Sequence, residues 1–276
     1  MYNMSVIALS NTDKTQELYE EYKQYIPDEL KEKLDYQYDK EKERIDIPIP
    51  RSTPEYARLK EQALANNLSV FEYEHSEYSK QEMKDAEYFQ MRVSDPLESE
   101  GTDARDYGTK YVNCCEACKI GGELYGDVLV DRKFVKKYGI ASLRPDIFVS
   151  KEVKWLIEEN ALTGVSFKHM VLDYKGREIP KYYVMTFENV LNPMDAQTWF
   201  SFEPAAKSCS VCGKKIPYLK SNFYYKREDL KGIKDFNLTM EAYNNFSERG
   251  IVVSKKVKEI FSKAKVRAGY MMLNIV

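Results

Sequence analysis

Two pairs of cysteines, each with two residues between its members, are the side chains of this chain best suited to chemistry. The first pair is Cys115 and Cys118, and the second pair is Cys209 and Cys212. Zinc accepts four thiolates in a tetrahedron, and two intervening residues let one tight turn present both sulfurs. A single pair is weak evidence, but two pairs in one chain predict one structural Zn²⁺ ion bound by these four cysteines.

The residues that follow the two cysteine pairs are not equally suited to a tight metal-binding turn. Gly213 follows Cys212 directly and permits the backbone conformation that a metal-binding turn needs. Lys119 stands at the equivalent place after the first pair and serves less well. The fifth cysteine, Cys114, precedes Cys115, and the sequence leaves open whether Cys114 replaces Cys115 as a ligand.

Other chemistry of the four thiols is less favoured. A thiol redox pair needs a strand before the motif and a helix that begins at it, and neither pattern is evident at Asn113 or Ser208. A catalytic zinc site keeps an open position and usually includes His or a carboxylate, whereas the chain has only His75 and His169. No sequence motif of a nucleophile or a phosphate-binding loop accompanies them. We therefore predict a protein that is not an enzyme and has no small-molecule substrate.

The strands and helices expected in the second half of the chain, which would position the cysteine pairs, follow an internal repeat. Residues Ile147–Lys154 align with Ile251–Lys258 at an offset of 104, and six of the eight positions are identical. Each copy predicts an apolar strand, then a serine that caps a helix, then a further strand. A cysteine pair precedes each copy, so we interpret the segments as an ancient duplication, with repeat units of about 108–200 and 201–276. The residues predicted to face the core at i, i+3 and i+4 spacing are Val153, Leu156 and Ile157 in the first helix, and Val257, Ile260 and Phe261 in the second.

The first part of the chain differs in charge and pattern. Residues 1–110 carry a net charge of −10 and residues 111–276 carry +8. We predict an acidic N-terminal α/β region over 1–107, followed by the zinc-binding domain over 108–276. The predicted fold class is α+β. The elements expected in the N-terminal region are a strand at 4–9, helices within 13–38, an extended edge at 45–50, a helix at 54–66, a strand at 70–74, a helix opened by Ser79 and Glu82, and a loop at 93–108.

Composition narrows the class of protein. The chain is 43% hydrophobic and 31% charged, which is typical of a globular protein and not of a disordered one. A net charge of −2 argues against a general nucleic-acid binder. No apolar run is long enough to cross a bilayer, and five cysteines without a secretory signal favour a reducing compartment. We therefore predict a cytoplasmic protein that does not bind membranes. Trp155 and Trp199, each beside apolar residues, are predicted to pack in the core.

The segments Cys115-Glu-Ala-Cys118 and Cys209-Ser-Val-Cys212-Gly213 resemble the bacterial double-CXXCG motif family. This family includes swarming-inhibition proteins and immunity proteins of polymorphic toxin systems. The resemblance is strongest over 208–276, where Asp229–Phe236 also fits, and Lys119 departs from the glycine that the family name implies. The resemblance implies a bacterial immunity protein that binds a cognate protein toxin and neutralises it by occlusion.

The acidic, tyrosine-rich N-terminal half is where we would place the contact with a basic toxin. The tyrosines considered are Tyr19, Tyr22, Tyr25, Tyr36 and Tyr38, for which a solvated helix with ring edges in the core is the other interpretation.

A zinc-ribbon protein that binds nucleic acid or has a regulatory role is the main alternative function, and a thiol redox protein is the second. The first alternative depends on the basic character of the C-terminal region and on nearby aromatic rings that could stack on bases. The basic residues are Lys214, Lys215, Lys220, Lys255, Lys256, Lys263, Lys265 and Arg267, and the rings are Tyr218, Phe223, Tyr224 and Tyr225.

Overall fold

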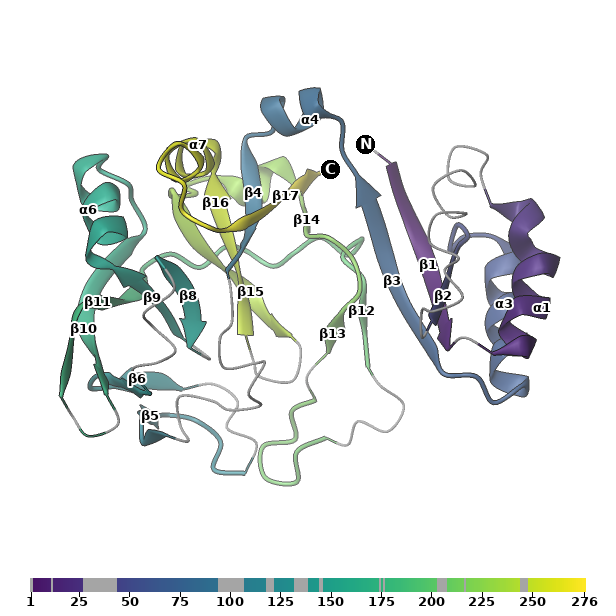
Figure 1. Ribbon diagram of the computed structural model, residues 1–276, viewed down its shortest axis with the longest axis horizontal. Helices are drawn as coiled ribbons and strands as arrows, with labels where there is room; N and C mark the ends of the chain where they lie inside the picture. The colour runs from purple at the N-terminus through teal and green to yellow at the C-terminus, as the bar shows by residue number, and fades with distance from the viewer. Residues whose placement is uncertain are drawn as a thin grey trace. The chain divides into compact units, whose positions relative to one another are not determined.

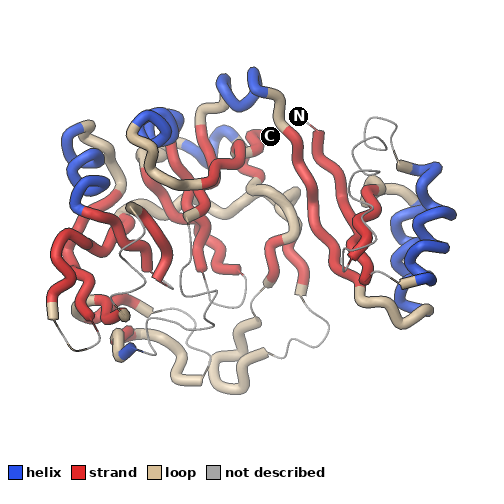
Figure 2. The backbone as a smooth tube through the Cα atoms, viewed as in Figure 1, coloured by secondary structure: helices blue, strands red, loops and turns tan. Residues whose placement is uncertain are grey.

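The chain forms two structural units, Met1–Met83 and Lys84–Val276 (Figures 1 and 2). The computed structural model describes residues 2–10, 12–26, 44–93, 107–117, 122–131, 139–143, 146–173, 175, 177–202, 208–215, 217–243 and 248–276. Strands outnumber helices over these residues as a whole, and the boundary between the two units falls within helix α4 (Lys80–Asp85). The prediction of an α+β fold is therefore confirmed. The regions 1–107 and 108–276 stay a prediction about domain organisation.

The first unit is a three-stranded antiparallel sheet with two helices. The strand order is β2-β1-β3, with Ile7 of β1 paired to Ile47 of β2 and to Glu72 of β3. Tyr56 and Lys60 of α3 both donate hydrogen bonds to the Glu72 carboxylate. Because Glu72 is paired with Ile7, the two side chains lie on the same face of the sheet, and α3 covers that face. The elements are β1 (Tyr2–Ser10), α1 (Asp13–Tyr22), the 3₁₀ helix η1 (Lys23–Tyr25), β2 (Arg44–Pro48), α3 (Pro54–Ala65) and β3 (Val70–Glu77).

Local sequence signals explain where these helices begin. The Thr12 side chain accepts a hydrogen bond from the Thr15 amide at the start of α1. Pro54 occupies the first turn of α3, where its missing N–H costs nothing. Ser79 and Glu82 form the predicted capping box, because each side chain accepts from the other residue's amide. The strands predicted at 4–9 and 70–74 and the helix at 54–66 are confirmed, whereas residues 27–43 lie outside the described residues.

The second unit contains two larger antiparallel sheets and three small two-stranded ones. One large sheet has the order β7-β10-β11-β9-β8, in which only β7 is parallel to its neighbour, and the other has the order β15-β16-β4-β17. The elements are α4 (Lys80–Asp85), β4 (Tyr88–Arg92), β5 (Lys110–Val112), β6 (Glu123–Tyr125), β7 (Val128–Val130), β8 (Ile140–Leu143), β9 (Asp146–Ser150), α6 (Lys151–Glu159), β10 (Val165–Asp173), β11 (Glu178–Phe187), β12 (Phe200–Ser201), β13 (Tyr218–Leu219), β14 (Tyr224–Tyr225), the 3₁₀ helix η4 (Arg227–Leu230), β15 (Phe236–Tyr243), β16 (Glu248–Ser254), α7 (Lys255–Lys263), β17 (Gly269–Met272) and β18 (Asn274–Ile275).

The two large sheets repeat one pattern of strand pairing. In each sheet, a hairpin leads into a helix, namely β8-β9-α6 in one and β15-β16-α7 in the other. The strand that follows the helix, β10 or β17, is separated from the hairpin by a middle strand that pairs with both. That middle strand is β11 in one sheet and β4 in the other, although β4 comes from the start of the unit. The registers also match. The equivalent trios of paired residues are Ile140–Val149–Tyr183 and Phe236–Val253–Phe89.

The helices α6 and α7 sit equivalently on these sheets. Ser150 and Ser254 cap them by accepting from the Val153 and Val257 amides, each at 3.4 Å. Val153 and Ile157 are buried in α6, as are Val257 and Phe261 in α7, and each such burial contributes about 1.5–3 kcal/mol. The predicted inward faces are confirmed for these four residues, whereas Leu156 and Ile260, the third member of each face, are half-buried.

Trp155 was predicted to pack in the core, and this prediction is wrong. Its side chain is 54% exposed because Trp155 lies on the face of α6 opposite Val153 and Ile157. The ammonium group of Lys151 lies 4.9 Å from the centre of the indole ring. Trp199 is half-buried.

Both helices end with a non-glycine residue in the left-handed region. Ala161 has φ +47° and Lys265 has φ +58°. The next residue in each case closes the helix, since the Leu162 amide donates to the Ile157 carbonyl and the Val266 amide donates to the Phe261 carbonyl. Glycine adopts this conformation without the steric cost of a Cβ atom.

Glycine at either helix end is therefore expected to stabilise the second unit. Ala161→Gly and Lys265→Gly should each raise the free energy of unfolding by about 0.5–1 kcal/mol, because relief of strain exceeds the added entropy of the unfolded chain. Urea denaturation measures the change. Ala264→Gly, one position earlier and at φ −82°, is the control and should destabilise instead.

Asp235 joins the two sheets of the second unit. Its carboxylate accepts hydrogen bonds from the amide and hydroxyl of Thr163, at the end of α6, and from the hydroxyl of Ser254, at the start of α7. Burial alone would raise the pKa of Asp235, but these hydrogen bonds and the Lys256 charge outweigh burial and hold the pKa below 3.8. Ionised Asp235 therefore stabilises the folded state.

The stabilisation by Asp235 is expected to depend on pH. A depressed folded-state pKa contributes stability that is present above the unfolded value of 3.8 and is lost as the pH falls through the folded value. Asp235→Asn should cost about 1–2 kcal/mol at pH 7 through the lost hydrogen bonds, and the difference from the wild type should shrink as the pH falls below 3.8. Urea denaturation across this pH range measures it, and a constant difference would contradict the assignment.

No helix in the part of the chain that the structure describes is long and apolar enough to span a membrane. The cytoplasmic location stays a prediction.

Candidate metal centre

The first cysteine turn, hereafter the first knuckle (residues 113–117), follows β5 and precedes β6 in a two-stranded hairpin. Asn113 has φ +60°, a conformation that asparagine tolerates, and it turns the chain towards Cys115. Tyr111 donates a hydrogen bond to the Asp146 carboxylate at the start of β9, with an O–O distance of 2.6 Å. The five-stranded sheet therefore holds the strand that leads into the first knuckle.

The second knuckle (residues 208–215) lies between β12 and β13, again within a two-stranded hairpin. The Gly213 amide donates to the Cys209 carbonyl at 2.8 Å, and the Cys209 amide donates to the Lys214 carbonyl at 2.9 Å. Gly213 has φ +68°, as the sequence predicted for this position. The Val211 amide donates a hydrogen bond to the Cys209 sulfur at 3.4 Å.

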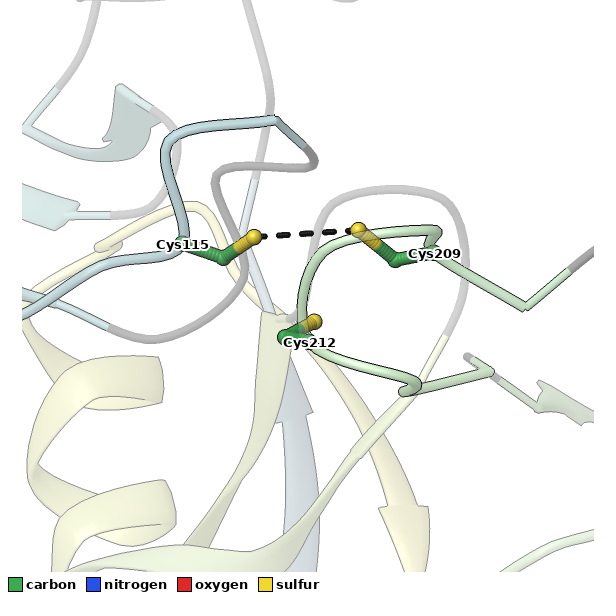
Figure 3. Close-up of side chains that lie close together, drawn as sticks. All are labelled: Cys115, Cys209 and Cys212. Carbon is green, nitrogen blue, oxygen red and sulfur yellow. Dashed lines mark hydrogen bonds between the residues drawn. The ribbon is translucent and has the colours of Figure 1, made fainter.

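Three sulfurs from the two knuckles meet at one place. The Sγ atoms of Cys115, Cys209 and Cys212 all lie within 4.8 Å of one another, and those of Cys115 and Cys209 are 3.7 Å apart. Figure 3 shows the sulfurs of Cys115 and Cys209 pointing towards each other. A tetrahedral zinc ion with Zn–S bonds near 2.3 Å separates its sulfurs by about 3.8 Å. The cluster therefore has the spacing that a thiolate-bound metal ion needs.

The cluster contains three of the four predicted ligands. Cys118 lies outside the described residues. Cys114 does not belong to the cluster, and its thiol lies 3.7 Å from the Tyr111 carbonyl oxygen. Cys115, and not Cys114, is thus the member of the adjacent pair that reaches the second knuckle. Among the described residues, no His, Asp or Glu joins this group of three.

The exposure of the cluster is uneven. Cys115 and Cys209 are half-buried, and Cys212 is exposed. Apolar side chains beside both knuckles are also exposed, with Val112 at 40% and Val211 at 66%. The arrangement can bind a soft divalent metal ion, and small solutes can reach it from the Cys212 side.

Two supports of the site escaped the sequence analysis. Gly122, at φ +112°, packs so closely on the first knuckle that a Cβ atom there would lie 2.9 Å from the Cys114 Cβ. The bond from Tyr111 to Asp146 joins residues 35 apart. The glycine in the loop after the first cysteine pair is visible in the sequence, whereas no local sequence feature indicates that Tyr111 contacts Asp146.

The tyrosines considered for toxin contact differ in exposure. Tyr22 is 1% exposed and donates a hydrogen bond to Gln62, so it belongs to the core of the first unit. Tyr25 is 42% exposed, and Tyr19 is half-buried. Tyr36 and Tyr38 lie outside the described residues.

No protein-family model and no curated protein matches the chain. The resemblance to the double-CXXCG motif family therefore stays a prediction.

Proposed function

We propose that the protein is a non-enzymatic binding protein whose second unit is stabilised by one structural zinc ion. Its ligands would be Cys115, Cys118, Cys209 and Cys212. The observation that carries the proposal is the meeting of Cys115, Cys209 and Cys212 within 4.8 Å, from turns 94 residues apart along the chain. Thiolates select soft or borderline ions, and zinc fits a closed thiolate tetrahedron without redox chemistry.

The duplication of the second unit explains how one ion draws on two distant motifs. Each knuckle lies within a short hairpin, and each copy contributes a further hairpin, a capped helix and a following strand. The hairpin strands β9 and β16 pair with β11 and β4 in matched register. We propose that each copy supplies half of the site. The metal then closes a loop of nearly a hundred residues, which is where a cross-link stabilises most.

The partner we propose is a cognate protein toxin, as the family resemblance implies. Three exposed carboxylates lie on α1 in the first unit, those of Glu17, Glu20 and Glu21. Each also forms an ion pair with a neighbouring basic side chain, which is Lys14, Lys23 and Arg58 respectively. A carboxylate-rich face complements a basic toxin, steers its approach and selects against acidic partners. Toxin binding that is unchanged in a Glu17→Lys/Glu21→Lys variant would exclude this face.

Metal content tests the proposal directly. The expected result is one zinc per chain in protein purified without a metal-affinity tag, measured by inductively coupled plasma mass spectrometry. Cys209→Ser/Cys212→Ser should bind none, because half of the ligands are gone. Cys114→Ser is the matched control and should keep the full equivalent. Fresh, reduced wild-type protein without metal would refute the structural zinc site.

A further inference from the structure

The thiol cluster brings together sulfurs of both knuckles, and the pair formed by Cys115 and Cys209 is in close contact. Cys115 and Cys209 are 3.7 Å apart, they point towards each other, and they come from different knuckles. Both are half-buried, while the third thiol, Cys212, is exposed and opens the cluster to solvent. A small oxidant can therefore reach sulfurs that are already placed for bond formation between the knuckles.

We propose that this cluster is a metal-release site that responds to hydroperoxides, and that its oxidised form is a disulfide between Cys115 and Cys209. The proposal rests on the structural metal site proposed above and adds its regulation. Oxidation would remove one ligand from each knuckle and leave Cys118 and Cys212, which are too few to retain the ion.

The chemistry balances with a hydroperoxide as the oxidant. The Cys209 thiolate, which accepts a hydrogen bond from the Val211 amide, attacks the peroxide; an S–O bond forms, the O–O bond breaks, and hydroxide or alkoxide leaves. The Cys115 thiolate then attacks the resulting sulfenic acid, an S–S bond forms, and hydroxide leaves. Two electrons pass from the two sulfurs to the peroxide, and a thiol reductant reverses the reaction.

The identity of the disulfide decides what happens to the fold. A bond within the second knuckle, between Cys209 and Cys212, would free the two knuckles from each other once the metal left. A bond between Cys115 and Cys209 keeps them joined, because it closes the same long loop as the metal. The hydrogen bonds from Gly213 to the Cys209 carbonyl and from Cys209 to the Lys214 carbonyl hold the turn that carries Cys209, whose sulfur faces Cys115. The two sulfurs have to approach from 3.7 Å to the length of an S–S bond, about 2.05 Å.

The test uses the full-length, metal-loaded chain. Hydrogen peroxide is added in the presence of a chromogenic zinc chelator, and the products are digested with trypsin without reduction. A disulfide between the knuckles links the fragments 111–119 and 208–214, whereas a disulfide within the second knuckle stays inside 208–214. Fragmentation of the linked peptides assigns the cysteines.

We expect release of one metal equivalent together with the Cys115–Cys209 linkage, and recovery of binding after dithiothreitol and zinc are added. Cys114→Ser should behave as the wild type, since Cys114 lies outside the cluster. Release with a Cys209–Cys212 bond, or with sulfinic acids only, would overturn the proposal, as would retention of the metal at peroxide concentrations that oxidise exposed thiols. Protein that carries no metal before treatment would refute the proposed function, and the release proposal with it.

Discussion

Cys209→Ser is expected to lower the free energy of unfolding of the second unit by roughly 4–5 kcal/mol, and its melting temperature by about 10–20 °C. Cys209 provides a sulfur 3.7 Å from Cys115 and also holds its own turn through the Val211 amide. Its loss removes both the metal and the link between the knuckles. Differential scanning calorimetry measures the change, and a chelator added to the wild type should reproduce it.

Cys114→Ser is the control for this measurement. Cys114 neighbours Cys115 but does not belong to the cluster, so its replacement should change stability by less than about 1 kcal/mol. Equal losses in the two variants would show that general packing at the first knuckle, and not metal binding, explains the effect. A chelator without effect on the wild type would contradict a stabilising metal ion.

Gly164→Ala is expected to destabilise the second unit by about 3–5 kcal/mol, from backbone strain and a steric clash together. Gly164 has φ +93°, and an added Cβ atom would lie 2.1 Å from the Phe236 carbonyl oxygen and 2.8 Å from the Lys234 Cβ. Since the oxygen belongs to the backbone, relief requires the start of β15 to move away from the segment that follows α6. Chemical denaturation with urea measures the loss.

Gly232→Ala is the control that separates the cost of backbone strain from the cost of the steric clash. Gly232 has φ +78°, and a Cβ atom there would meet no atom within 4 Å. Its replacement should cost only the conformational part, about 1–2 kcal/mol. If both variants lose the same amount, the close approach of Gly164 to Phe236 contributes nothing and the contact between the two sheets is not as tight as described.

Short-range signals predicted most elements correctly. The capping serines Ser150 and Ser254, the apolar spacing in α6 and α7, and the Pro54 start of α3 each depend on residues within one or two turns of the chain. The same locality made the cysteine turns recognisable, since two residues between thiols and a following glycine define a knuckle. Trp155 shows the limit, because its apolar neighbours in sequence lie on another face of the helix.

Pairing between distant segments could not be predicted from local pattern. Strand β4 inserts between β16 and β17, which come from the other end of the second unit, and its register against β16 matches that of β11 against β9. Beyond the alternation of apolar and polar residues, nothing in the local sequence of a strand indicates which other strand it pairs with. The hydrogen bond from Tyr111 to Asp146 and the close approach of Gly164 to Phe236 also join segments that are distant in the sequence, so the local pattern does not predict them either.

The sequence by itself indicated the cysteine pairs as a candidate metal site, the repeat and the α+β class, because these depend on residue type and spacing along the chain. Only the tertiary structure decided that Cys115, rather than Cys114, meets Cys209 and Cys212, although Cys209 lies 94 residues further along the chain. The reason is that the distance between thiols on separate hairpins is set by how the two repeated sheets pack within the second unit. That packing depends on contacts such as those of Asp235 with Thr163 and Ser254.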